Sequence, residues 1–168
     1  MTSPRSRPPE PKVAGLHHHT VAIGHLVASL YDAGQPSLRH GLDDPGPGVP
    51  SITAVIGQLD TSDLNRVVTV TTDTQLPTVT VQGKCTWRHL AAVLGPKGWA
   101  VAADAACRPT QDQQTVGSAV KLGQVQPVWA EVLTADGRIS RHDATQPGGW
   151  SLPPDALIVA VALPLARA

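Results

Sequence analysis

The sequence predicts an α+β fold in which two small lobes of mixed or antiparallel sheet carry flanking helices. Two stretches repeat apolar residues with the period of an amphipathic helix, and capping residues and glycines mark their ends. Short runs rich in β-branched residues, separated by turn residues, predict hairpins in both halves of the chain. The chain shows no internal repeat of about 20–50 residues, so a repeat architecture is not expected.

Chain length and proline distribution define the expected domain. The chain has 168 residues, which suits one ordinary domain that buries roughly 70% of its unfolded surface. Residues 1–12 contain four prolines and few apolar residues, and we expect a disordered tail there. Residues 13–168 are predicted to form a single domain with lobes at about 13–95 and 96–168.

Composition excludes several classes of protein. The 13 basic and 13 acidic residues balance, whereas nucleic-acid-binding proteins usually carry a basic excess. No apolar run reaches the length of about 18 residues that a membrane-spanning helix needs, and the first 12 residues lack the apolar region of a secretory signal. Cys85 and Cys107 make neither a disulfide framework nor a zinc pattern. We therefore expect a cytoplasmic protein without a metal, with neither nucleic acid nor a membrane as a partner.

The first expected helix spans residues 20–33. Thr20 can cap its N-terminus and Gly34 fits the position after its end. A loop follows at residues 41–50, which are rich in proline and glycine. The apolar stripe of this helix consists of Ile23, Leu26, Val27 and Leu30.

A hairpin and a second helix come next. Residues 66–72 (RVVTVTT) and 78–82 (TVTVQ) are β-branched runs on either side of a turn, so they predict a hairpin. The helix begins after the capping residue Thr86 and ends at Gly95-Pro96. Its expected apolar face consists of Trp87, Leu90, Ala91 and Leu94.

The second half of the chain is richer in strands. A turn is expected at residues 115–117 (TVG). Residues 128–134 and 138–140 flank the turn sequence ADG and predict another hairpin. Residues 147–149 (PGG) predict a loop, and the apolar run 156–163 predicts a closing strand that is buried on both faces.

The order of these segments is similar to that of a known family. Residues 79–137 contain a strand, a glycine turn, a capped helix, a TVG turn and a strand that ends in TADG. Residues 20–41 place a helix and a strand before a first loop, and residues 59–83 place a strand and a hairpin before the second helix. Residues 146–165 supply a glycine-rich turn and a last strand. Over about residues 14–165 the chain resembles the FAD-binding (PCMH-type) domain of the vanillyl-alcohol oxidase superfamily of FAD-linked oxidases.

This resemblance implies a flavin site. In the family, backbone N–H groups of two glycine-containing loops hold the FAD pyrophosphate, because glycine permits left-handed geometry and close approach. The matching cofactor-binding positions of this chain are Arg39, His40, Gly41, Thr115, Val116, Gly117, Ser118 and Gly123. The resemblance also implies a neighbouring substrate cleft, for which the candidates are Arg108, Lys121, Trp129 and Trp150.

Both loops depart from the family pattern. The usual first loop reads Arg-Gly-x-Gly-His-Ser, whereas residues 39–44 read RHGLDD, so side chains fill both glycine positions. Asp43 replaces the histidine that carries a covalent flavin in many relatives, and an 8α-histidyl bond therefore cannot form there. Ser118 replaces the second glycine of the family's TVGG. The family's C-terminal substrate domain is missing, which makes a separate substrate-domain subunit an expected partner.

Few other residues suggest chemistry. Residues 17–19 are three consecutive histidines, which we interpret as a polar segment before the first helix because neighbouring residues project in different directions. Cys85 and Cys107 are interpreted as small buried residues, and His89 is expected on the solvent side of the second helix. The chain contains no G-x-S-x-G elbow, P-loop or G-x-G-x-x-G motif.

Three functions remain open from the sequence. The first is a stand-alone FAD-linked oxidase-like domain, a flavin-binding oxidoreductase component whose chemistry is that of the flavin. The second is a flavin-independent cyclase or pericyclase of secondary metabolism, which uses the vacated flavin cleft to hold a folded substrate. The third is a non-catalytic binding module. The expected small-molecule ligand is accordingly FAD or an apolar molecule.

Overall fold

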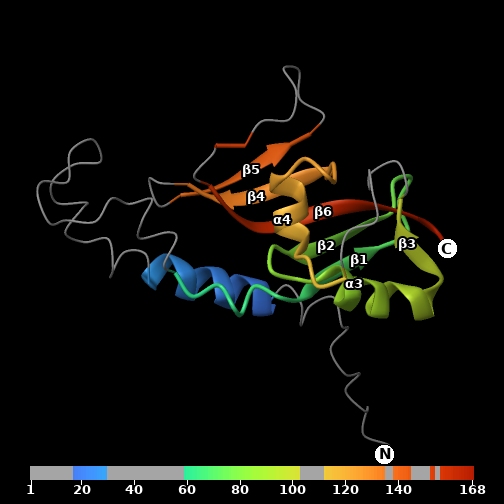
Figure 1. Cartoon of the computed structure of the whole chain (residues 1–168), viewed down its shortest axis with the longest axis horizontal. Coiled ribbons are helices and arrows are strands. Elements are labelled where there is room, and N and C mark those ends of the chain that lie inside the picture. Colours follow the sequence, from blue (N-terminus) through green and yellow to red (C-terminus); the bar gives the residue numbers. More distant parts are fainter. Residues whose placement is uncertain (1–16, 30–58, 103–111, 135–137, 145–151, 154–155) are drawn as a thin grey trace, which may run out of the picture.

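The computed structural model confirms the α+β class. Helices pack on a single sheet, and every described strand pairing is antiparallel (Figure 1). None of the described helices is long and apolar enough to cross a membrane. The residues that the structure describes are 17–29, 59–102, 112–134, 138–144, 152–153 and 156–168.

The sheet contains six described strands. They run in the order β1-β2-β6-β4-β5, and β3 pairs with β6 beside this path. The strands are β1 (Val67–Thr71), β2 (Thr78–Gln82), β3 (Trp99–Val101), β4 (Trp129–Leu133), β5 (Ile139–Asp143) and β6 (Leu157–Arg167). Both predicted hairpins are therefore confirmed, as the pairs β1–β2 and β4–β5.

The last strand, β6, is the central strand of this sheet. It pairs with β2 on one side, with β4 on the other, and with β3 near its C-terminal end. Most of its residues are buried, as expected for a strand with neighbours on both sides and helices on both faces. The predicted closing strand is confirmed, and it extends to Arg167 because β3 supplies a further partner there. The Arg167 guanidinium lies 4.2 Å from the ring centre of Trp99 in β3.

The described part of the first helix covers residues 17–29. Thr20 therefore lies inside the helix, and the prediction that it caps the N-terminus is wrong. The three histidines continue the helix because His19 is buried against the sheet and has a hydrogen-bond partner there. The predicted Leu30 and Gly34 lie outside the described residues.

The predicted second helix is α3 (Trp87–Leu94), and its cap is confirmed. The Thr86 hydroxyl accepts a hydrogen bond from the His89 backbone N–H at 3.2 Å. The apolar face differs from the prediction at one position, since Ala91 is exposed and Val93 is half-buried. A 3-10 turn, η1 (Gly95–Lys97), follows α3.

The TVG sequence begins a helix and does not form the predicted turn. This helix is α4 (Val116–Lys121), and its cap is Thr115, whose hydroxyl accepts from the Ser118 backbone N–H at 3.2 Å. The helix has six residues, too few for the apolar period to be seen in the sequence. Tertiary packing supports it, because Val116 and Val120 are buried.

Two apolar clusters lie on opposite faces of the sheet. The larger cluster contains residues of α3, α4 and the sheet, including Leu90, Val116 and Val161. The smaller cluster joins the helix of residues 17–29 to the sheet and includes Leu26 and Val159. Strand β6 contributes to both clusters, because successive side chains of a strand point to opposite faces.

Gly83 and Gly117 lie where the backbones of β2, β6 and the start of α4 approach one another closely. The Gly83 N–H donates to the Val159 carbonyl, and the Gly117 N–H donates to the Gly83 carbonyl, both at 2.9 Å. A Cβ atom on Gly83 would lie 2.2 Å from the Ile158 carbonyl oxygen, and one on Gly117 would lie 2.7 Å from the Gly83 oxygen. Glycine is needed at both positions because the backbones approach too closely for a side chain.

Candidate functional site

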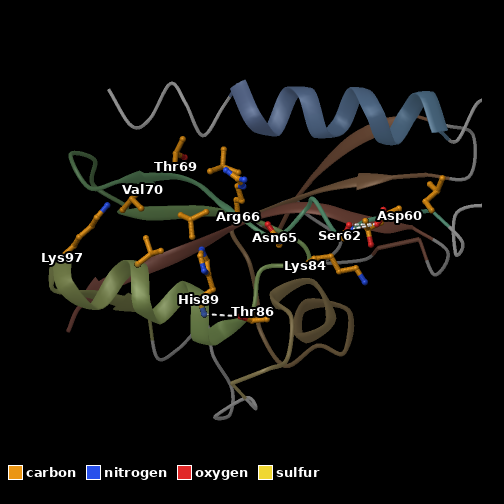
Figure 2. Close-up of a pocket in the computed structure, with 15 residues that line it drawn as sticks. Asp60, Ser62, Asn65, Arg66, Thr69, Val70, Lys84, Thr86, His89 and Lys97 are labelled. Carbon is orange, nitrogen blue, oxygen red and sulfur yellow. Dashed lines mark hydrogen bonds between the residues drawn. The ribbon is translucent and has the colours of Figure 1, made fainter. Parts of the chain in front are cut away.

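A groove of about 1120 Å³ runs between strand β1 and helix α3 (Figure 2). We call it the β1–α3 groove. Its lining consists of residues 59–62, residues 65–70, Lys84, and Thr86, His89, Val93 and Lys97 from the region of α3. Four consecutive residues of β1 contribute, although neighbouring side chains of a strand point to opposite faces. The groove therefore follows the outer edge of β1, and in Figure 2 the labelled Thr69 and Val70 lie on opposite sides of the strand.

The helix wall of the groove has a regular spacing. His89, Val93 and Lys97 follow one another at intervals of four residues, which places them along one side of α3 and its η1 extension. The other side of α3 packs into the core through Leu90 and Leu94. Figure 2 shows His89 and Lys97 extending from this helix toward β1.

The groove carries a positive charge. Arg66, Lys84 and Lys97 line it, and the carboxylate among its lining residues is that of Asp60. The Ser62 hydroxyl donates to Asp60 Oδ1 at 2.6 Å and the Ser62 backbone N–H donates at 3.0 Å. These hydrogen bonds, with the hydroxyl bond as the larger cause, lower the pKa of Asp60. The carboxylate is therefore ionised at neutral pH, and the lining contains three cations and one anion.

The described cofactor-binding candidates do not line this groove. Thr115, Val116, Gly117 and Ser118 form the start of α4, and Gly123 follows its end in a left-handed conformation. Arg39, His40 and Gly41 lie outside the described residues, so the structure brings together only the second of the two candidate loops.

The backbone donors at the start of α4 already have partners within the protein. The Val116 N–H donates to the Cys85 carbonyl at 2.8 Å, and the Gly117 N–H donates to the Gly83 carbonyl at 2.9 Å. The Ser118 N–H donates to the Thr115 hydroxyl at 3.2 Å. A pyrophosphate needs several free N–H groups that point toward it. The described residues at this position therefore do not fit the pyrophosphate of FAD.

The described candidates for a substrate cleft lie on different elements and outside the groove. Lys121 is exposed in the last turn of α4. Trp129 lies in β4, where the Arg141 guanidinium of β5 covers its ring at 4.1 Å from the ring centre. Arg108 and Trp150 lie outside the described residues.

Sequence reasoning missed a buried polar chain that connects the first helix to the sheet. Gln82 is fully buried, and its Oε1 accepts from the Arg66 backbone N–H at 3.0 Å. Its Nε2 lies 3.1 Å from His19 Nδ1, and His19 Nε2 lies 3.5 Å from a carboxylate oxygen of Glu131. Because Gln82 Oε1 is used as an acceptor, its Nε2 must donate to His19 Nδ1. His19 therefore carries its proton on Nε2 when it is neutral, facing Glu131.

Within the described ranges, no three His, Cys, Asp or Glu side chains are grouped as metal ligands. His19 is buried and has both Gln82 and the half-buried Glu131 as hydrogen-bonding neighbours in the polar chain. His17 is exposed, so the three consecutive histidines do not converge.

The comparisons with known proteins do not identify a family. No protein-family model and no curated protein sequence matches this chain. The likeness to the PCMH-type domain therefore stays a prediction from the order of its sequence motifs.

Cys85 is expected to react slowly in the folded protein. Its side chain is buried, and burial raises the pKa of its thiol from the ordinary value of 9.0 to about 11. The folded state therefore retains a proton that the unfolded chain loses near pH 9, and the stability contributed by this thiol falls as pH rises from about 9 to about 11.

The measurement is the rate of disulfide exchange with Ellman's reagent in the Cys107→Ser variant, in which Cys85 is the one remaining thiol. We expect labelling at pH 8 to be more than about 100-fold slower in buffer than in denaturing urea. The rate in buffer should continue to rise above pH 9, where the rate in urea levels off. Equal rates in both solvents would show that Cys85 is accessible.

Proposed function

We propose that this chain is a non-catalytic binding domain that holds an anionic ligand in the β1–α3 groove. The observation that carries the proposal is the groove lining, which contains three cations, Arg66, Lys84 and Lys97, and one carboxylate, Asp60, together with several valines. A concave surface with one dominant sign of charge concentrates the field and attracts ligands of the opposite sign.

The groove suits binding better than a flavin-dependent oxidation. The second candidate loop of the flavin site uses its N–H groups within the protein, at Val116, Gly117 and Ser118. The groove lies between the edge strand β1 and helix α3 and is lined by none of these residues. The flavin oxidase and its separate substrate subunit remain predictions of the sequence resemblance.

The groove also differs from what a cyclase of apolar substrates needs. Such an enzyme accelerates its reaction by enclosing a folded substrate in a closed, apolar cavity. The β1–α3 groove is open along the sheet edge, and charged side chains form its rim. This arrangement favours a ligand that lies along the groove with its charges at the rim.

Titration with citrate tests the proposal, with NMR amide spectra of the full chain as the readout. We expect citrate to shift the amide signals of Lys84, His89 and Lys97 and to leave those of α4 unchanged. Raising the salt from about 0.05 M to about 0.3 M should weaken binding several-fold, since screening reduces the attraction between exposed charges.

Charge reversal supplies the control for this titration. The double variant Lys84→Glu/Lys97→Glu should lose citrate binding, whereas Lys121→Glu, an exposed lysine outside the groove, should retain it. The same samples are incubated with FAD and desalted, and we expect no flavin absorbance to remain. Retained flavin, or citrate shifts that persist in the double variant, would overturn the proposal.

A further inference from the structure

We infer that the ligand of the β1–α3 groove is an extended acidic segment of a partner protein, which adds as a strand to the outer edge of β1. This inference rests on the proposed anion-binding function and specifies the class of ligand. Strand addition combines backbone hydrogen bonds along a sheet edge with side-chain contacts in a neighbouring groove. The fold places both at β1.

The first requirement is a set of backbone groups that point outward from β1. These groups can be identified once it is known which backbone groups of β2 point toward β1. The Gly83 N–H points toward β6 and the Gln82 N–H points toward β1, since they donate to Val159 and Arg66 respectively. Because strand residues alternate, Thr78 and Thr80 also direct their backbone groups toward β1.

The register then assigns the outward groups. Thr69 and Thr71 lie opposite Thr80 and Thr78, so they use their N–H and C=O groups on β2. The N–H and C=O of Val70, between them, consequently point to the outer edge. No described strand pairs with that edge, which is the edge that the groove follows.

The outer edges of β1 and β5, the two end strands of the main path, differ in their protection against added strands. Strand β5, at the opposite edge, has the sequence ISRHD, and its Arg141 and Asp143 form an ion pair at 3.5 Å. Charged side chains are a common device that prevents edge pairing. Strand β1 has the sequence VVTVT, which contains no charge and has high β-propensity. Of these two edges, the one beside the groove is therefore the better suited to receive a strand.

The helix α3 provides the side-chain contacts. A strand added to the five residues of β1 would be about 17 Å long, at about 3.4 Å per residue. Every second side chain of the added strand would lie on the same face of the sheet as the Val70 side chain. This is the face that carries α3, because Val70 packs against the core cluster that includes residues of α3. Val93 offers an apolar surface to such side chains, and His89 and Lys97 flank it.

The charges select an acidic partner and disfavour a second copy of this chain. Arg66, Lys84 and Lys97 line the groove that the added strand would enter, and carboxylates on that strand would offset their charge. Pairing of β1 with β1 of a second copy would bring two such sets of cations together. Repulsion between them opposes that dimer.

Fluorescence anisotropy with the full chain and two labelled peptides tests the inference. The first peptide has seven alternating glutamate and valine residues, which cover the five residues of β1 with one residue to spare at each end. The second has the same sequence with N-methyl groups on alternate residues, which keeps the charge but removes the N–H groups that a sheet edge requires. We expect the first peptide to bind at least about tenfold more tightly, since each lost hydrogen bond costs about 0.5–1.5 kcal/mol.

A variant of the strand edge supplies a second measurement. Val70→Pro removes the outward N–H, and proline is tolerated at the outer side of an edge strand. This variant should lose at least about tenfold in peptide affinity and keep its affinity for citrate. Hydrogen exchange should show protection of the Val70 amide only when the first peptide is present.

The outcomes separate this inference from the proposed function. Equal binding of the two peptides, with citrate binding intact, would overturn strand addition and leave the anion-binding groove. If the protein without substitutions binds neither the peptides nor citrate, the proposed function itself is overturned. A Val70 amide that is protected without peptide, or a concentration-dependent dimer that peptide does not dissociate, would show that the edge has another occupant and would also overturn the inference.

Discussion

Gly83→Ala is expected to destabilise the protein by more than about 3 kcal/mol, a large part of the roughly 5–15 kcal/mol that stabilises an ordinary domain. The new Cβ would lie 2.2 Å from the Ile158 carbonyl oxygen, and a backbone atom of the central strand cannot move aside cheaply. Relief of the overlap would break the hydrogen bond from Gly83 to Val159, on which the junction of β2 and β6 depends. Gly117→Ala should have the same direction of effect, with its Cβ at 2.7 Å from the Gly83 oxygen.

Urea unfolding monitored by circular dichroism provides the measurement for Gly83→Ala. The matched control is Gly24→Ala, because Gly24 lies within the helical residues 17–29 and a Cβ there would meet nothing within 4 Å. Alanine is the better helix former, so Gly24→Ala should stabilise the protein by about 0.5–1 kcal/mol. A Gly83→Ala protein with the same unfolding midpoint as the unmodified chain would contradict the close approach of β2 to β6.

Gln82→Leu is expected to destabilise the protein by about 2–4 kcal/mol. Leucine fills a similar volume but leaves two groups without partners, the part-buried Arg66 N–H and the buried His19 Nδ1. Each buried polar group that loses its hydrogen bond costs about 1–3 kcal/mol. The loss should also weaken the attachment of the first helix, because Gln82 joins that helix to β1 and β2.

Thermal unfolding of Gln82→Leu is compared with that of Glu131→Gln. The glutamine oxygen can still accept from His19 Nε2, and residue 131 is partly exposed, so this control should lose less than about 1 kcal/mol. Nitrogen-15 NMR of the histidine side chains supplies an independent readout, with the neutral His19 expected to carry its proton on Nε2. A proton on Nδ1 would show that the Gln82 amide has the opposite orientation.

Local sequence signals predicted the regular elements well. The cap at Thr86 and the apolar spacing up to Leu94 gave the position of α3, and β-branched runs gave the two hairpins. Two short elements, strand β3 and helix α4, were missed or misread. Strand β3 depends on its pairing with β6, and α4 depends on burial of Val116 and Val120, and neither cause is visible in a short stretch of sequence.

The candidate site was harder to predict than the fold. The groove combines residues 59–70 with Lys84 and with one side of α3, and its charge arises only when the hairpin and the helix lie side by side. His89 was correctly expected to be exposed, but its position in a groove could not be inferred from its own element. The polar chain was missed for the same reason, because its members are distant in the sequence. His19 is 63 residues from Gln82 and 112 residues from Glu131.

The central place of β6 has a consequence for how the chain folds during synthesis. The hairpins β1–β2 and β4–β5 are local and can form as soon as they leave the ribosome, but each then has an unpaired inner edge until β6 inserts between them. Contacts between distant parts of a chain slow folding, and unpaired edges promote association with other chains. The interval before residues 157–167 emerge is therefore the period in which the nascent protein is most exposed to aggregation, and in which a chaperone that covers sheet edges would protect it most.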